Sequence, residues 1–345
     1  MADTPFLAPY PWQQPNWLHL CSQLHDQKLP HAIMLTGPQG LGKLHFALMA
    51  ARLMLCLSPV NDLACGSCKT CQLIAAGSHP DFMQLIPEDG SKIIKIDQVR
   101  GVTDFVNKTP QQGKRKVIIV SPVEALNINA ANALLKSLEE PAGNSTLLLV
   151  SHSPSLVMAT IRSRCQKMEL SIPAKTDSLA WLTPLVVGHN AEYLLECASG
   201  APLAALALTG NEKLEYRENF ATGLNNIAET KTSPLDVAGE LHKVEPLEHI
   251  ETLLNWLQLA LKYGVEGIES SHFQEQQLLK TIQSVPQALV FRFMDKLFGV
   301  KRQVLSGSNP NKQLLLEELL FDWDALCSRS QQRLSARKNL LSGLN

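Results

Sequence analysis

The sequence has no long apolar run and no excess of charge of either sign. In 345 residues no apolar stretch approaches the roughly 18–20 residues that a membrane helix needs. The 31 Lys and Arg residues almost balance 32 Asp and Glu residues, so the net charge is −1. This balance gives no electrostatic reason to wrap nucleic acid, although it is compatible with a local basic patch. With 45% hydrophobic and 18% charged residues, we expect a globular protein with a rather apolar surface.

The first residues also lack a basic segment followed by an apolar core, so they do not resemble a secretory signal. We therefore expect a cytoplasmic location and no membrane partner. In that reducing compartment, eight cysteines favour a metal site or free thiols over disulfides. The chain length exceeds the usual size of one hydrophobic core and predicts two or three domains.

A loop of the phosphate-binding type is present, but its metal ligand is missing. A short apolar run, 32–36, leads into the loop 37–43, which fits G-x-x-x-x-G-K with Gly37, Gly42 and Lys43 at the fixed positions. In such loops backbone N–H groups surround phosphates and the lysine reaches the β- and γ-phosphates. The next residue should be Ser or Thr, which holds Mg²⁺, but it is Leu44, which offers no oxygen to a hard cation.

The acidic pair of a P-loop ATPase is missing as well. The apolar run 117–120 predicts a buried strand, and in such ATPases this strand ends in Asp and Glu, which hold Mg²⁺ and position the attacking water. Here it ends in Ser121 and Pro122, and Glu124 comes two residues too late. Two independent losses argue against ATP hydrolysis by this chain. For Lys43 two interpretations stay open, a residual phosphate ligand or a solvated cation at a helix start.

Four cysteines have the spacing of a metal site. Their pattern is C-x8-C-x2-C-x2-C, and we expect them to hold one structural Zn²⁺ through four thiolates: Cys56, Cys65, Cys68 and Cys71. An iron–sulfur cluster is the alternative, although the fourth cysteine lies upstream and no Cys-Pro follows. No His, Asp or Glu completes an open catalytic site among them, so we assign this metal no chemistry. The remaining cysteines fit packed positions.

The order of the predicted elements indicates an α/β fold followed by helices. Apolar runs alternate with helical patterns up to residue 172, which is typical of a parallel sheet covered on both faces. After Pro173 the pattern is helical, with leucine-rich stripes over 253–261, 289–305 and 314–327.

Three features of the sequence together resemble the bacterial DNA polymerase III clamp-loader subunits of the AAA+ superfamily. They are the cysteine cluster, the segment 132–141 (Asn-Ala-Leu-Leu-Lys-Ser-Leu-Glu-Glu-Pro) and the segment 161–165 (Ile-Arg-Ser-Arg-Cys). The resemblance is strong over residues 1–210 and rests on architecture beyond. The tau/gamma type of subunit keeps an intact loop and the Asp-Glu pair, so Leu44 and Ser121 match the ATPase-deficient delta-prime type. Leu203, where that superfamily places a sensor arginine, agrees with this assignment.

The resemblance implies three domains. A RecA-like AAA+ domain would cover 1–172 and include the zinc module 56–71. A small helical lid would cover 173–211. An all-helical collar, through which such subunits form a ring, would cover 212–345.

The resemblance also implies a function without intrinsic catalysis. The chain would scaffold the hetero-oligomeric ring and lend Arg164, with Ser163, as an arginine finger to a neighbouring ATPase subunit. It would count as an enzyme only as part of the polymerase holoenzyme. Its partners would be tau/gamma and delta subunits, the sliding clamp and primer-template DNA, with Arg100 and Lys136 as candidate phosphate contacts.

Alternatives without a specific function stay open for these residues. Arg164 could be a surface ion-pair partner, and Arg100 and Lys136 could belong to solvated helix faces. At the level of the whole chain, the alternatives are a self-sufficient tau/gamma-type ATPase and a zinc-bearing DNA-binding protein that works alone.

Overall fold

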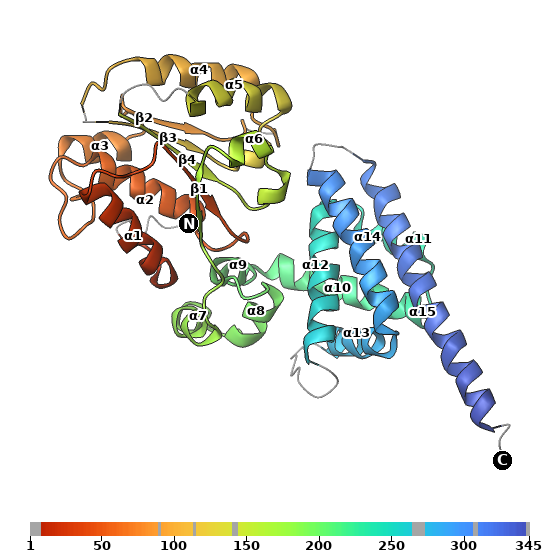
Figure 1. Cartoon of the computed structure of the whole chain (residues 1–345). Coiled ribbons are helices and arrows are strands. Elements are labelled where there is room, and N and C mark those ends of the chain that lie inside the picture. The colour runs from red at the N-terminus through yellow and green to blue at the C-terminus, as the bar shows by residue number, and fades with distance from the viewer. Residues whose placement is uncertain are drawn as a thin grey trace. The chain divides into compact units, whose positions relative to one another are not determined.

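The computed structural model describes residues 8–88, 91–112, 115–139, 144–263, 273–305 and 310–342, and for 211 and 329–342 it describes the backbone only. The chain divides into two compact units (Figure 1). The first comprises Met1–Trp181 with Ala201–Ala204, and the second comprises Leu182–Gly200 with Ala205–Asn345.

The first unit is built on a parallel sheet in the order β2-β3-β4-β1-β5. Every residue of the three central strands is buried, which explains why these strands consist almost entirely of apolar residues. The strands are β1 (Ala32–Thr36), β2 (Phe82–Leu85), β3 (Lys116–Val120), β4 (Ser145–Val150) and β5 (Gln166–Glu169).

Helices cover both faces of this sheet. Alternate residues of β1 point to opposite faces, so Ile33 and Leu35 pack with α1 and α2, whereas Met34 packs with α4 and α5. Figure 1 shows these two helical layers on either side of the strands. The helices around the sheet are α1 (Gln14–His25), α2 (Lys43–Leu55), α3 (Lys69–Ala75), α4 (Ile96–Asn107), α5 (Ile128–Glu139) and α6 (Ala159–Arg162), with short 3-10 turns at Pro11–Gln13, Val123–Ala125 and Pro154–Leu156. Two further helices, α7 (Lys175–Leu182) and α9 (Pro202–Ala207), each contain residues of both units.

The second unit is helical throughout its described residues. Its core contains the fully buried side chains of Phe220, Trp256 and Trp323, and the indole N–H of Trp323 donates to the carbonyl of Leu224 at 2.9 Å. The helices are α8 (Ala191–Cys197), α10 (Asn211–Ala228), α11 (Pro234–Leu241), α12 (Pro246–Tyr263), α13 (Phe273–Ser284), α14 (Gln287–Leu305) and α15 (Lys312–Ser342), with a 3-10 turn at Thr183–Leu185.

A buried ion pair lies inside the second unit. Nε of Arg217 on α10 donates to Glu275 on α13 at 2.9 Å, and both side chains are almost fully buried. The hydroxyl of Tyr193 on α8 donates to the other carboxylate oxygen at 2.9 Å, and Asn255 on α12 accepts from the guanidinium at 3.2 Å. The network therefore ties four helices together through hydrogen bonds that satisfy both charges.

The predicted fold class is confirmed in its architecture: a parallel α/β sheet is followed by a C-terminal helical part. The division at 172/173 and 211/212 into three domains stays a prediction. The predicted end of a helix at Pro141 lies outside the described residues. None of the helices in the described part of the chain is long and apolar enough to cross a bilayer.

Candidate functional site

The phosphate-type loop follows β1 and leads into α2, as predicted. Gly40 and Gly42 have φ angles of 82° and 77°, a region that side chains disfavour. The side chain of Lys43 turns back into the loop, where its ammonium donates to the carbonyls of Gly37 at 2.7 Å and Pro38 at 2.5 Å. The loop's own carbonyls therefore hold the cation that would otherwise meet a phosphate.

Burial changes the acid–base behaviour of this lysine. Only 2% of Lys43 is exposed, and desolvation lowers the pKa of its ammonium to about 8 against the attraction of the Glu124 carboxylate. The Glu124 carboxylate itself accepts the backbone N–H groups of His152 at 2.6 Å and Ser153 at 3.0 Å. Glu124 thus serves to fix the segment after β4.

The residues that stand in place of the other expected nucleotide ligands can be located in the structure. Leu44 is half-buried and packs against the hydrophobic cluster of α1 and α2. Ser121 and Pro122 directly follow β3, where the acidic pair of an ATPase would stand. The backbone N–H of Leu203 donates to the carbonyl of Gly40 at 3.0 Å, so the segment in which the resemblance implies a sensor arginine packs on the loop.

Segments distant in sequence cover the loop closely. Gln13 donates from its side chain to the carbonyls of Leu41 at 2.8 Å and Gly42 at 3.0 Å. A Cβ on Gly40 would lie 2.5 Å from the Cβ of Ala204, and one on Gly42 would lie 2.8 Å from the Tyr10 ring. Both glycines are required because other parts of the chain approach their backbone.

Tyr10, which lies against Gly42, belongs to a cluster of aromatic rings. The rings of Tyr10 and Trp12 stack with centroids 4.9 Å apart, Trp181 meets Trp12 edge-on at 5.0 Å, and His45 lies 4.4 Å from Tyr10. This cluster could not be predicted from the sequence, because nothing in the local pattern around Trp12 indicates a partner as distant as Trp181.

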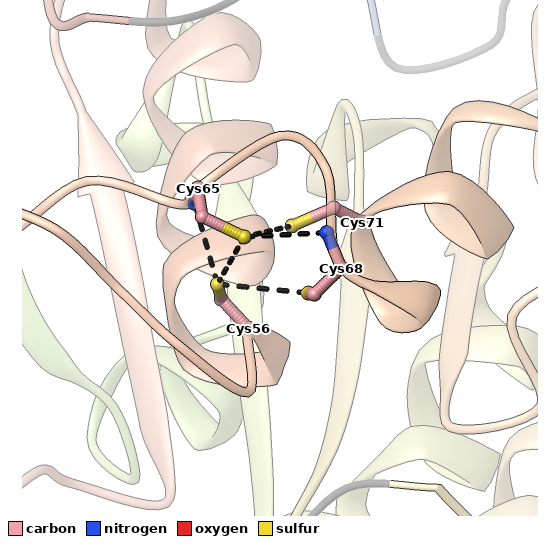
Figure 2. A group of neighbouring side chains, drawn as sticks. All are labelled: Cys56, Cys65, Cys68 and Cys71. Carbon is pink, nitrogen blue, oxygen red and sulfur yellow. Dashed lines mark hydrogen bonds between the residues drawn. The ribbon is translucent and has the colours of Figure 1, made fainter.

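The four predicted metal ligands converge at one point. Cys56 directly follows α2, Cys65 lies in the turn, Cys68 precedes α3 and Cys71 lies in α3 (Figure 2). All four sulfurs lie within 4.8 Å of one another, and neighbouring Sγ–Sγ distances are 3.6, 3.9 and 4.0 Å. Tetrahedral coordination with bonds of about 2.3 Å places sulfurs about 3.8 Å apart. The cluster therefore fits a tetrahedral metal ion, and the thiols are free.

Hydrogen bonds in and around the turn lower the pKa of two of the four thiols. Hydrogen bonds from the backbone N–H of Cys68 and the hydroxyl of Ser58 lower the pKa of Cys65 to about 5. Burial raises the pKa of Cys68, but hydrogen bonds led by the one from Thr70 outweigh it, so its pKa falls to about 7. Burial raises the pKa of Cys56 and Cys71, so these thiols need the charge of a cation to ionise at neutral pH.

The candidate finger lies just after α6 with its side chain half-exposed. Nη1 of Arg164 donates to the carbonyl of Thr160 at 2.9 Å, and Nη2 lies 2.5 Å from the carboxylate of Glu139, the last residue of α5. Ser163 also donates to the carbonyl of Thr160, at 3.1 Å. Glu139 lies in the Leu-Glu-Glu-Pro motif, but nothing in the local pattern indicates that it pairs with Arg164.

The two DNA candidates lie on the helical layer formed by α4 and α5. Arg100 is exposed on α4 and pairs with Asp97 at 3.0 Å, one turn earlier. Lys136 is exposed on α5. This pairing offsets part of the charge that Arg100 could offer to a phosphate.

Comparisons with known proteins find relatives over most of the chain. A family profile described as "DNA polymerase III, delta subunit" matches residues 12–174, and one described as "DNA polymerase III, delta subunit, C terminal" matches 211–325. The DNA polymerase III subunit delta' of Pseudomonas aeruginosa is 38% identical over 92% of this chain and 98% of that protein. The subunit delta' of Yersinia pestis is 32% identical over 92% of this chain and 96% of that protein, and that of Escherichia coli is 29% identical over 90% and 94%.

Proposed function

Since the chain belongs to the family of DNA polymerase III delta' subunits, we propose that it is a non-catalytic subunit of a clamp-loader complex. In this role it scaffolds a hetero-oligomeric ring and supplies Arg164, with Ser163, to the ATP bound by a neighbouring subunit. The ring then loads a sliding clamp onto primed DNA in the cytoplasm. The partners are the tau/gamma and delta subunits, the clamp and primer-template DNA.

One combination of observations carries this proposal. The loop retains a lysine, but its own carbonyls hold that lysine, Leu44 offers magnesium no oxygen, and Ser121 and Pro122 supply no carboxylate. Arg164, in contrast, remains half-exposed at the surface. A guanidinium is planar and always charged, so it can stabilise the charge on a transferring phosphoryl group. A chain that has replaced its own magnesium ligands but keeps an accessible arginine is better suited to assist ATP hydrolysis in a neighbour than to hydrolyse ATP itself.

The second unit supports the scaffold role through its apolar surface. Phe291 and Phe298 on α14 and Phe321 on α15 are exposed by 52%, 41% and 49%. Exposed aromatic side chains of this number favour contact with a partner protein. We assign the collar to 212–345 and a helical lid to 173–211.

For the four cysteines we propose zinc. Four thiolates at tetrahedral spacing suit this ion, and the site closes the segment between α2 and α3. A coordinatively complete site leaves no position for a substrate, so the ion stabilises the module. For DNA we propose that Arg100 and Lys136 meet phosphates of the template strand within the assembled ring.

A self-sufficient ATPase is the second candidate function. Lys43 favours it, because this residue is the one nucleotide ligand of the loop that the sequence keeps. Two observations weigh against it: Lys43 is hydrogen-bonded to the loop itself, and Leu44, Ser121 and Pro122 replace the expected magnesium ligands.

The proposal is tested by reconstituting the full complex with Arg164→Ala. A finger supplied in trans is worth about 10³–10⁵ in rate in GTPases, and a ring with several ATP sites should show a smaller loss. We expect the DNA- and clamp-stimulated ATPase to fall while assembly and metal content stay unchanged. Arg164→Lys should restore little, since an ammonium cannot make the planar, two-pronged contact.

Arg162→Ala is the matched control, because it removes an exposed arginine two residues away. A fully assembled complex whose ATPase is unchanged by Arg164→Ala would reduce Arg164 to a surface ion-pair partner.

A further inference from the structure

Two sequence motifs lie next to each other on the first unit, and the proposed function uses only one of them. Glu139 belongs to Leu-Glu-Glu-Pro at the end of α5, and Arg164 belongs to Ser-Arg-Cys after α6, yet their side chains lie 2.5 Å apart. We propose that Glu139 is a positioning residue, which holds the Arg164 guanidinium in the orientation in which it meets the neighbouring subunit's phosphate. This inference rests on the trans role proposed for Arg164.

The guanidinium is fixed at both of its terminal nitrogens. Nη2 contacts Glu139, and Nη1 donates to the carbonyl of Thr160 at 2.9 Å. Because the group is planar, two contacts at different nitrogens determine the plane in which the remaining N–H groups lie. An arginine without them would sample many rotamers and would lose that freedom when the phosphate binds.

Donors remain for a second anion. A guanidinium has five N–H donors, and the contacts to Glu139, to Thr160 and, at 3.5 Å, to the hydroxyl of Ser163 use three of them. The Arg164 side chain is 35% exposed, so a phosphate can reach the others from solvent. Binding of a phosphate therefore does not require Glu139 to leave.

The strength of the pair favours positioning over inhibition. The Glu139 side chain is 49% exposed, and pairs of such exposure shift an equilibrium by about fivefold or less. A contact of that size cannot keep the finger away from a multiply charged phosphate. It can, however, reduce the number of orientations that the free finger explores.

The location of Glu139 is otherwise unfavourable for its own helix. A carboxylate in the last turn of α5 lies near the negative end of the helix dipole. Arg164 offsets that repulsion, so the helix end gains from the same contact that orders the finger.

The test compares four complexes, each reconstituted from full-length subunits: wild type, Glu139→Gln, Arg164→Ala and the double variant. The readouts are kcat and KM for ATP in the presence of clamp and primed DNA, with assembly followed by gel filtration. We expect Glu139→Gln to lower kcat about two- to fivefold with KM unchanged, since a finger acts on the transition state. The double variant should match Arg164→Ala alone, because Glu139 acts through that arginine.

Glu169→Gln is the matched control, since Glu169 is an exposed carboxylate of the same unit that pairs with Lys167. Wild-type kcat for Glu139→Gln beside a slow Arg164→Ala would overturn the positioning role and leave the trans role intact. A faster Glu139→Gln would make Glu139 an inhibitor of the finger. A double variant slower than Arg164→Ala would mean that Glu139 acts elsewhere, and an unchanged Arg164→Ala would reject the trans role itself.

Discussion

The ammonium of Lys43 lies 2.7 Å from the carbonyl oxygen of Gly37, so the most conspicuous nucleotide ligand of the loop binds the loop itself. An ammonium in that position braces the turn between β1 and α2. Because 2% of the residue is exposed, this contact is made away from solvent, and the charge carries a desolvation cost.

This burial predicts a pH dependence of stability. Lys43 has a pKa of about 8 in the folded chain and an ordinary value near 10.5 when unfolded, so between these values the unfolded chain binds more protons. Stability should therefore rise with pH over this window, by at most about 1.4 kcal/mol per pH unit. The measurement is the free energy of unfolding of wild type minus that of Lys43→Met, from pH 7 to 10.5. The difference should increase over this range.

Restoring one ligand should not create an ATPase. Leu44→Ser supplies the hydroxyl that magnesium needs, but Ser121 and Pro122 still replace the acidic pair. We expect neither the wild-type chain nor Leu44→Ser to release phosphate above background, since catalysis of phosphoryl transfer rests on the metal and electrostatic contacts. Turnover that persists through purification and disappears in Lys43→Ala would establish the self-sufficient ATPase instead.

The sheet and the metal ligands could be predicted from the sequence, because both depend on local patterns. Apolar runs such as 117–120 identify central strands, and two C-x2-C spacings place sulfurs on one side of a turn. The alternating apolar residues Met168, Leu170 and Ile172 predict a strand over 168–172, but the structure has this strand at Gln166–Glu169. It pairs with β1, and pairing ends where β1 turns into the glycine loop after Thr36.

Contacts between distant residues could not be predicted in this way. Periodicity tells which face of α10 is buried, but not that Arg217 will meet Glu275 across 58 positions. The same holds for Glu139 and Arg164, and for Gln13 against the loop at Leu41. In each case the partner is set by how helices and turns pack, which no single segment encodes.

Loss of one thiolate should release the metal. In Cys68→Ser the hydroxyl is a poor substitute for a thiolate, and we expect zinc content to fall from one ion per chain to well below one. The module should lose about 3 kcal/mol or more of stability, roughly a quarter of the free energy typical of a four-ligand structural zinc site. Elemental analysis and thermal unfolding measure both effects.

The control for this variant is Cys165→Ser, which alters a half-buried thiol outside the cluster and should keep the ion. Iron with acid-labile sulfide in the wild-type chain would replace zinc by a cluster. Acidification should release the ion from wild type as well, because protons compete for the thiolates.

Breaking the buried ion pair of the second unit should be costly. Arg217→Met leaves the Glu275 carboxylate in the core without its countercharge, a change that typically costs about 3–5 kcal/mol. Adding Glu275→Gln should recover part of the loss, since an amide needs no countercharge. Denaturant unfolding measures both variants. A single variant within about 1 kcal/mol of wild type would mean that water or another group compensates the charge.

Because the chain passes from the first unit to the second and back, the order of synthesis decides when each unit can complete its contacts. The loop at Gly40 completes its contact only when Leu203 has been made, and by then the segment 182–200 of the other unit has already been synthesised. Tyr193 in that segment finds its carboxylate partner 82 residues later. At about 5–20 residues per second this delay lasts about 4–16 s, much longer than a small helix needs to form. The nascent chain therefore carries α8 as an unfinished piece of the helical unit while the first unit is already able to close.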